Sequence, residues 1–264
     1  MDNPINTPYI KFYSDSFGNK KFFKCGLLTC RNSQHPNTLK CAPHRVVLRK
    51  DTKFTVGWDN KASPGMSMHS LLTSHEGELS EWARNMPICT VIHLGAIDVN
   101  NKLVKDTGKA YGDYVFNFLE QMKIVAKRYL TNKEKESFEE KLREDHRFLL
   151  CGLPDWGKDY KPKYSHSLTP KQYKNARRRL NSAMKKNRKK LWREHKCVLF
   201  TPELNNPARN GIHLTPKETV NFAKQIATVC GRLCCTYCRI LMSGKFDKNH
   251  HQAETLKSGG CDLS

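Results

Sequence analysis

The 264-residue sequence has few acidic residues for its length and no long apolar run. No stretch of about 18 consecutive apolar residues occurs, and the N-terminal residues lack the apolar core of a signal peptide. We therefore expect a protein that has no transmembrane segment, is not secreted by that route, and is cytoplasmic or nuclear. The eleven cysteines are an odd number without a secretory signal, which favours reduced thiols, with metal binding as the alternative.

The shortage of acidic residues leaves a large positive charge. Forty-six Lys and Arg stand against 25 Asp and Glu, which gives a formal charge of +21. Such an excess is typical of proteins with a polyanionic partner, either a nucleic acid or an anionic membrane surface. The alternative is a soluble protein with a solvated basic exterior. The charge leaves the oligomeric state open.

Much of this charge lies in one segment, residues 157–196. It holds fifteen Lys or Arg and two acidic residues, so it contributes +13 of the +21. Its apolar residues recur at helical spacing, which predicts a helix that packs on the core and exposes a basic face. The apolar stripe consists of Tyr173, Ala176, Leu180, Met184 and Leu191.

Closely spaced cations on one helix can bind successive phosphates and release counterions. We therefore predict binding of RNA or single-stranded DNA, and the interleaved Tyr160, Tyr164, Tyr173 and Trp192 are candidates for stacking on bases. A nuclear-localisation signal at 185–190 is the rival interpretation. The predicted nucleic-acid-binding residues are Arg177, Arg178, Arg179, Lys185, Lys186, Arg188, Lys189 and Lys190.

Strand-like and helix-like segments alternate along the chain. This order predicts an α/β fold, a three-layer α/β/α sandwich with a mostly parallel sheet. We expect one domain over 1–242, which includes the basic segment 157–196, and a polar tail over 243–264. The expected strands are 9–13, 45–48, 54–58, 89–94, 146–151 and 198–200, and the expected helices are 20–28, 66–82, 111–145, a helix within 157–196, and 215–242.

Four short stretches follow the predicted strands or precede the last helix. They contain Ser16, Gly65, the residues 95–98 and the residues 210–215. In a parallel sheet they meet at the carboxyl ends of the strands, where open α/β sheets hold their sites. Ser16 as nucleophile, His213 as base and the N–H groups of Ser16 and Gly65 as oxyanion donors would suit acyl transfer.

The order and spacing of these stretches resemble the SGNH (GDSL-type) hydrolase family. Its four blocks look like Ser14-Asp15-Ser16, Gly65, Gly95-Ala96-Ile97-Asp98 and Asn210-Gly211-Ile212-His213-Leu214-Thr215. The resemblance implies an SGNH-hydrolase fold from about Tyr9 to Cys230. It also implies serine esterase activity through a Ser16–His213 dyad.

The sequence departs from this family at three chemically important positions. Ile97 stands where the family has an asparagine that donates to the oxyanion, and isoleucine has no donor. Asn210 stands in place of the aspartate that orients the histidine, and a neutral amide there can favour the wrong tautomer. Ser14 replaces a glycine. These departures predict a catalytically impaired hydrolase scaffold.

Two function classes therefore stand side by side. The leading prediction is nucleic-acid binding on an impaired SGNH-like scaffold, and the alternative is an active serine esterase. In fold and charge together, the chain is similar to the RNA-binding C-terminal domain of the insect protein Oskar and to esterase domains of retrotransposon proteins. The plainer interpretations are that Ser16 is a helix N-cap, His213 a loop histidine and Ile97 a core residue.

Two groups of cysteines have loosely zinc-like spacing. One consists of Cys235, Cys238, His250 or His251, and Cys261, and the other of Cys25, Cys30, Cys41 and His44. However, Cys238 of the first group also shares a helical face with Cys230 and Cys234, where cysteine serves as a small apolar residue. We expect no cofactor, with zinc as the alternative.

Overall fold

The computed structural model describes residues 9–16, 57–103, 107–155, 167–203 and 214–234. Within these ranges, five strands form one sheet in the order β2-β1-β3-β4-β5, and all neighbouring strands are parallel. The predicted parallel α/β architecture is confirmed. The strands are β1 (Tyr9–Ser14), β2 (Gly57–Asn60), β3 (Cys89–His93), β4 (Arg147–Cys151) and β5 (Cys197–Phe200).

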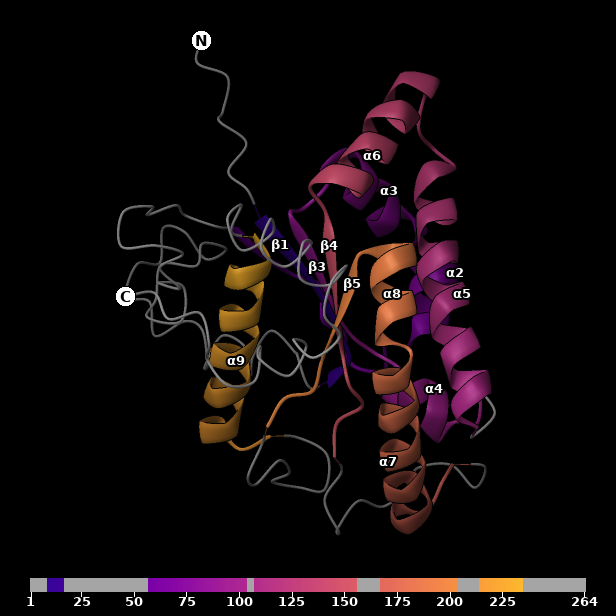
Figure 1. Ribbon diagram of the computed structural model, residues 1–264, viewed down its shortest axis with the longest axis vertical. Coiled ribbons are helices and arrows are strands. Elements are labelled where there is room, and N and C mark those ends of the chain that lie inside the picture. Colours follow the sequence, from indigo (N-terminus) through magenta and orange to yellow (C-terminus); the bar gives the residue numbers. More distant parts are fainter. Residues whose placement is uncertain (1–8, 17–56, 104–106, 156–166, 204–213, 235–264) are drawn as a thin grey trace.

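Helices cover both faces of the sheet, so the molecule has three layers (Figure 1). On one face lies α9 (Pro216–Cys234), packed over β1, β3 and β4. The other face carries the remaining described helices, which run from α2 to α8. Their bounds are α2 (Met68–Ser74), α3 (Glu76–Arg84), α4 (Ala96–Asn100), α5 (Gly108–Lys127), α6 (Asn132–Glu144), α7 (Pro170–Lys186) and α8 (Arg188–His195).

The strands supply two hydrophobic cores because successive side chains point to opposite faces of a sheet. In β1, Phe12 packs with Phe222 of α9, whereas Tyr13 joins the core under the larger helical layer. In β4, Leu149 likewise lies in the core under α9 and Leu150 in the core under the larger helical layer. Both faces are buried, which explains why these strands place apolar residues on both faces rather than alternating apolar with polar ones.

The predicted helical stretch 111–145 is in fact two helices. The side chain of Thr131 accepts a hydrogen bond from the Glu134 N–H, and the Glu134 carboxylate accepts one from the Thr131 N–H. This reciprocal capping box starts α6, and four residues separate it from the end of α5. The helix expected to reach Trp82 is likewise divided, between α2 and α3 at His75.

The basic segment also forms two helices, which meet at Asn187. A capping box between Thr169 and Gln172, with Pro170 in the first turn, begins α7. At Asn187 the backbone leaves helical geometry, with φ −87° and ψ 1°, and α8 follows. The predicted apolar stripe is confirmed, because all five of its members are buried: Tyr173, Ala176, Leu180, Met184 and Leu191.

Some expectations fall on residues that the structure does not describe. The expected helix over 20–28, the strand over 45–48 and the tail over 243–264 lie outside the described ranges. So does the expected domain boundary at residue 242. The expected strand over 54–58 is described only from Gly57, where β2 begins and runs to Asn60. None of the helices in the described ranges combines the length and apolarity needed to cross a bilayer.

Candidate active site

The candidate site lies where the order of the strands reverses. The chain passes from β1 outward to β2 on one side and returns to β3 on the other side of β1. In such sheets the crevice outside the carboxyl ends of these two strands is the usual ligand site. Ser16 lies two residues beyond the end of β1 and is half-buried, and Asp15 between them is buried. The structure thus places Ser16 at the edge that the sequence predicted.

The turn that carries Gly65 lies beside the end of β1. The Ser63 N–H donates to the Ser14 carbonyl at 3.0 Å, which ties the segment after β2 to the last residue of β1. Gly65 itself is exposed and has φ +82°, a conformation that favours glycine. A Cβ at this position would meet nothing within 4 Å. The backbone at Gly65 is therefore exposed, in the segment that is tied to the end of β1.

The third stretch is joined to the second by the buried carboxylate of Asp98. Its two oxygens accept hydrogen bonds from the Met68 N–H at 3.0 Å and the His69 N–H at 3.2 Å, at the start of α2. The Tyr114 hydroxyl donates to the same carboxylate at 2.7 Å. Asp98 thus accepts hydrogen bonds from N–H groups at a helix N-terminus that have no partner within the helix. Its three hydrogen bonds join α4 to the start of α2 and to α5.

Ile97 is the second residue of α4, the short helix that also carries Asp98, and it is half-buried. The glycine before that helix, Gly95, has φ +109°, and a Cβ there would lie 2.7 Å from the Tyr111 hydroxyl oxygen. The backbone of the third stretch is therefore held in a form that requires glycine at position 95. The side chain at position 97 has no hydrogen-bond donor.

A buried pair that the sequence did not predict lies at the ends of β1 and β3, and its serine lies two residues before Ser16 in the chain. Ser14 Oγ lies 3.0 Å from His93 Nδ1, and the pair joins the ends of β1 and β3. Burial lowers the pKa of His93 from 6.5 to about 4, so its ring is neutral at pH 7. Because His93 is only 3% exposed, it is a structural residue and not a base open to substrate.

His213 and Asn210 lie outside the described residues, so their predicted roles stay predictions. The described chain resumes at Leu214, which is buried, and the Thr215 side chain accepts a hydrogen bond from the Glu218 N–H at 3.2 Å. Thr215 thus caps α9, which begins where the sequence predicted the helix over 215–242. Phe222 of α9 then packs against the His93 ring, with the ring centroids 4.9 Å apart.

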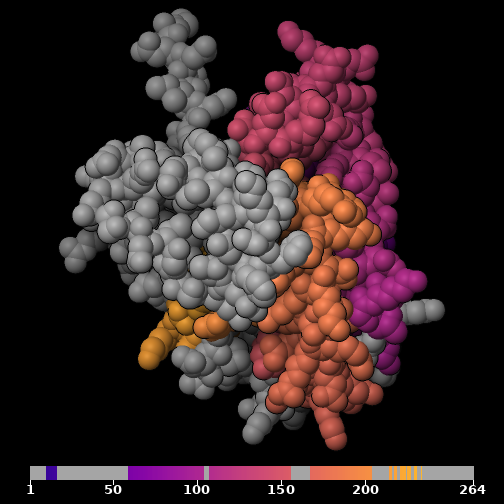
Figure 2. All heavy atoms as spheres, viewed as in Figure 1, coloured from indigo at the N-terminus to yellow at the C-terminus, as the bar shows by residue number. Residues whose placement is uncertain are grey.

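The basic helices form a strip of the surface beside α5 (Figure 2). Six of the eight predicted nucleic-acid-binding residues are exposed, and Arg188 is half-buried. Arg177 is different, because it is half-buried and its guanidinium lies 2.9 Å from the Asp155 carboxylate. We therefore remove Arg177 from the predicted binding surface. The six exposed residues are Arg178, Arg179, Lys185, Lys186, Lys189 and Lys190.

The predicted stacking of bases on Tyr173 and Trp192 is wrong. Tyr173 is fully buried, and its hydroxyl donates to the Pro154 carbonyl at 3.1 Å. Trp192 is 7% exposed, and the cations of Arg147 and Lys196 lie over its ring. Neither ring has a face to offer to a nucleotide. The other two stacking candidates, Tyr160 and Tyr164, lie outside the described residues.

The zinc candidates cannot be placed, because both groups lie outside the described ranges: Cys25, Cys30, Cys41 and His44, and Cys235, Cys238, His250, His251 and Cys261. In the part of the chain that is described, no group of three or more His, Cys, Asp or Glu could hold a metal ion. Cys230 is buried in the core under α9, as expected for an apolar role.

Comparisons with known proteins identify the fold. No family model matches the chain, and no curated protein matches it. Among solved structures, the chain is similar to Est24, a carbohydrate acetylesterase from Sinorhizobium meliloti, with 11% identity and a TM-score of 0.54 over 86% of this chain and 99% of that one. A second carbohydrate acetylesterase family member from the same organism gives 13% identity and a TM-score of 0.51, with the same coverage.

This chain therefore has an SGNH-hydrolase-like fold, as the four sequence blocks predicted. At this level of identity the likeness defines the fold alone, and chemistry must be argued from the residues of the site.

Proposed function

We propose that this protein is a serine acyl hydrolase that cleaves esters, with Ser16 as nucleophile and His213 as base. The observation that carries the proposal is the position of Ser16, which lies two residues after β1 and is half-buried at the point where the strand order reverses. The segment that carries the exposed Gly65 is tied to the end of the same strand by the bond from the Ser63 N–H to the Ser14 carbonyl. The esterases of similar fold favour this function over the nucleic-acid binding that the sequence placed first.

The proposed reaction is a two-step acyl transfer. Ser16 Oγ attacks the ester carbonyl while His213 accepts the hydroxyl proton, and the N–H groups of Ser16 and Gly65 donate to the oxyanion. Collapse of the tetrahedral intermediate breaks the bond to the alcohol, which leaves with the proton from His213. Water then attacks the acyl-enzyme by the same path in reverse and releases the acid and free Ser16.

Two residues set the expected rate. Ile97 leaves the oxyanion without a side-chain donor, a loss that is worth about 3 to 4 kcal/mol in related chemistry. Asn210 supplies no negative charge to stabilise the imidazolium of His213. We therefore expect slow turnover, with formation of a covalent adduct at Ser16 easier to detect than sustained hydrolysis.

The test is labelling of the purified protein with a fluorescent fluorophosphonate. We expect the wild type to be labelled and Ser16→Ala to be unlabelled. Ser137→Ala is the matched control, because Ser137 is an exposed serine on α6, away from the site. Circular dichroism establishes that each variant is folded. A folded wild-type protein that takes no label, or a Ser16→Ala variant that labels equally well, contradicts the proposal.

A second candidate function is binding of single-stranded nucleic acid, and one specific observation favours it. Nine Lys or Arg side chains of α7 and α8 are exposed, against a single acidic residue, Glu194, on the same two helices. Such a surface binds phosphates through counterion release, so affinity should fall steeply with salt. A binding curve that hardly moves between low and physiological salt contradicts this function and leaves the esterase proposal untouched.

A further inference from the structure

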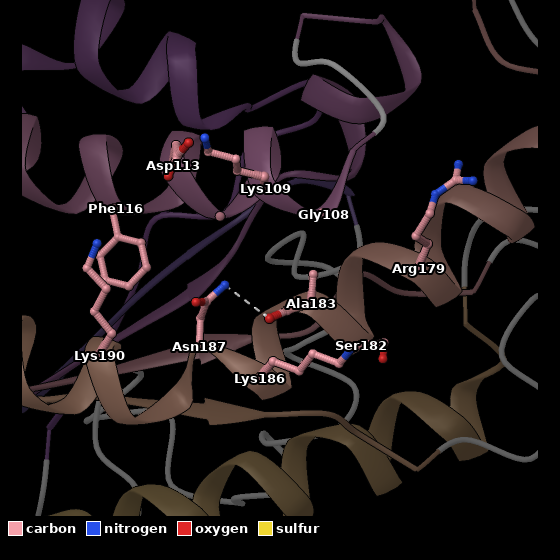
Figure 3. A pocket seen from close by; sticks show the side chains of 11 residues that line it. Gly108, Lys109, Asp113, Phe116, Arg179, Ser182, Ala183, Lys186, Asn187 and Lys190 are labelled. Atoms are coloured by element: carbon pink, nitrogen blue, oxygen red, sulfur yellow. Dashed lines mark hydrogen bonds between the residues drawn. The ribbon is translucent and has the colours of Figure 1, made fainter.

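A groove separates the N-terminal half of α5 from the region where α7 and α8 meet (Figure 3). It has a volume of about 540 Å³. Four cations line it, one from α5 and three from α7 and α8, together with one acidic residue, Asp113. The groove therefore carries a formal charge of +3. The four cations are Lys109, Arg179, Lys186 and Lys190.

The floor of the groove is set by close packing of two helices. A Cβ on Gly108 would lie 2.7 Å from the Ala183 Cβ, and one on Gly112 would lie 3.1 Å from Asn187 Nδ2. Small residues on α5 thus let its backbone approach α7. The Asn187 side chain is held in turn by a hydrogen bond to the Ala183 carbonyl at 3.2 Å. This part of the groove is formed before any ligand binds, so little ordering accompanies binding.

The cations are spread along the groove and do not converge on one point (Figure 3). At one end the Lys190 ammonium lies over the Phe116 ring, 4.4 Å from its centroid, which fixes the position of the charge. Arg179 lies at the other end, and Lys186 stands between them. Arg179 and Lys186 are about 10 Å apart along the helix axis, from a rise of about 1.5 Å per residue. An extended anion fits this row better than a single small one.

We propose that this groove binds the sugar-phosphate backbone of a single-stranded nucleic acid without reading its sequence. The inference rests on the second candidate function and is independent of Ser16. Because Lys190 covers a face of Phe116, the groove offers charges to phosphates but no open aromatic platform to bases. Binding should therefore depend on phosphate number and salt, and only weakly on base identity.

An anionic membrane is the other polyanion that a basic surface can meet, and it fits less well. Membrane-surface helices bury large apolar side chains beside their cations. Among the described residues, the exposed large apolar side chains are Leu103, Ile124 and Tyr129, and none of them lines the groove. A recessed row of charges also suits a narrow chain of phosphates better than a flat surface.

The test compares two pairs of neighbouring lysines on the same helices. Lys186→Gln/Lys190→Gln removes two groove cations, and Lys185→Gln/Lys189→Gln removes two cations that do not line the groove. All four lysines are exposed, so the two variants match in charge, residue type and location. Binding is measured by anisotropy with a fluorescent oligouridine RNA over a series of salt concentrations, and circular dichroism checks the fold.

We expect the groove variant to lose affinity on the order of tenfold and the control variant clearly less. The slope of log K against log salt should fall by about 1.4 in the groove variant, since each phosphate contact on a single strand contributes about 0.7. If the two variants lose affinity equally, the proposal that the groove is the binding site is wrong, and nucleic-acid binding by a diffuse basic surface remains. No RNA binding by the wild type overturns the second candidate function and this inference together.

A gain of affinity provides a test that unfolding cannot imitate. Asp113→Asn removes the acidic residue of the groove, and we expect it to tighten RNA binding a few-fold. Glu140→Gln makes the same change of charge at an exposed position on α6 and should have a smaller effect. Equal gains of RNA affinity in the two variants contradict the proposal that the groove is the binding site. A last experiment measures binding of the wild type and the groove variant to vesicles that contain phosphatidylserine. If the groove variant loses vesicle binding but retains RNA binding, the groove binds membranes and the proposal is wrong.

Discussion

Asn181, in the middle of α7, holds the backbone of Leu153 by two hydrogen bonds. Its Oδ1 accepts from the Leu153 N–H at 2.8 Å, and its Nδ2 donates to the Leu153 carbonyl at 3.1 Å. Leu153 lies just beyond β4. One amide side chain thus satisfies both polar groups of a buried residue where the sheet ends and ties the basic helix to that edge.

Asn181→Ala should therefore destabilise the fold. The substitution leaves a buried N–H and a buried carbonyl without their partner, which costs about 1 to 3 kcal/mol. Urea unfolding measures the change in the free energy of unfolding. Asn175→Ala is the matched control, because Asn175 is exposed on the same helix and should be neutral or slightly stabilising. Equal effects from the two substitutions would show that the Leu153 contact contributes nothing.

Asp98→Asn should also destabilise, for a different reason. An amide turns one of the two acceptor oxygens into a donor, which then faces an N–H or O–H donor from Met68, His69 or Tyr114. It also removes a negative charge from the N-terminus of α2. We expect a loss of about 1 to 3 kcal/mol in urea unfolding. The exposed Asp113→Asn is the control and should change stability by less than about 0.5 kcal/mol.

The elements that the sequence predicted well are those fixed by local pattern. The apolar run over 89–94 predicted a strand buried on both faces, and it forms β3 over 89–93. The helical stripe of 173–191 is buried as its period requires. That period also predicts the burial of Tyr173, so its membership of the stripe was sufficient to exclude it from base stacking. The break before α6 could have been predicted from Thr131 and Glu134, which spell a capping box.

The contacts that the sequence could not predict depend on which strands become neighbours. Ser14 and His93 are 79 positions apart, and they meet only because β1 pairs with β3 in one particular register. Asp98 belongs to the third stretch that the sequence singled out, yet its bonds to the start of α2 depend on the tertiary fold. Local pattern located the edge of the sheet, and the tertiary arrangement determined which polar groups pair there.

The buried His93 predicts how stability depends on pH. Burial lowers its pKa from 6.5 to about 4, so between these values the unfolded chain binds a proton that the folded protein does not. The free energy of unfolding therefore falls as the pH drops from 6.5 toward 4, by up to about 1.4 kcal/mol per pH unit for this group. His93→Asn should reduce the measured slope by this one group's share in urea titrations at several pH values, while His146 and His195, whose pKa values burial also lowers to about 4, keep a residual slope. Ser14→Ala keeps the histidine, so its slope should persist.

Ile97 occupies the position that the resemblance to SGNH hydrolases assigns to an oxyanion donor. Ile97→Asn gives that position an amide N–H, and if the proposed reaction runs at Ser16 we expect p-nitrophenyl acetate hydrolysis to rise by about 10²-fold, the effect of one such donor. The double variant with Ser16→Ala is the control and should show no gain. A gain that survives in the double variant comes from another site. An unchanged rate, in a folded protein whose Ser16 is labelled by fluorophosphonate, means that position 97 does not face the oxyanion and that the backbone N–H groups act alone.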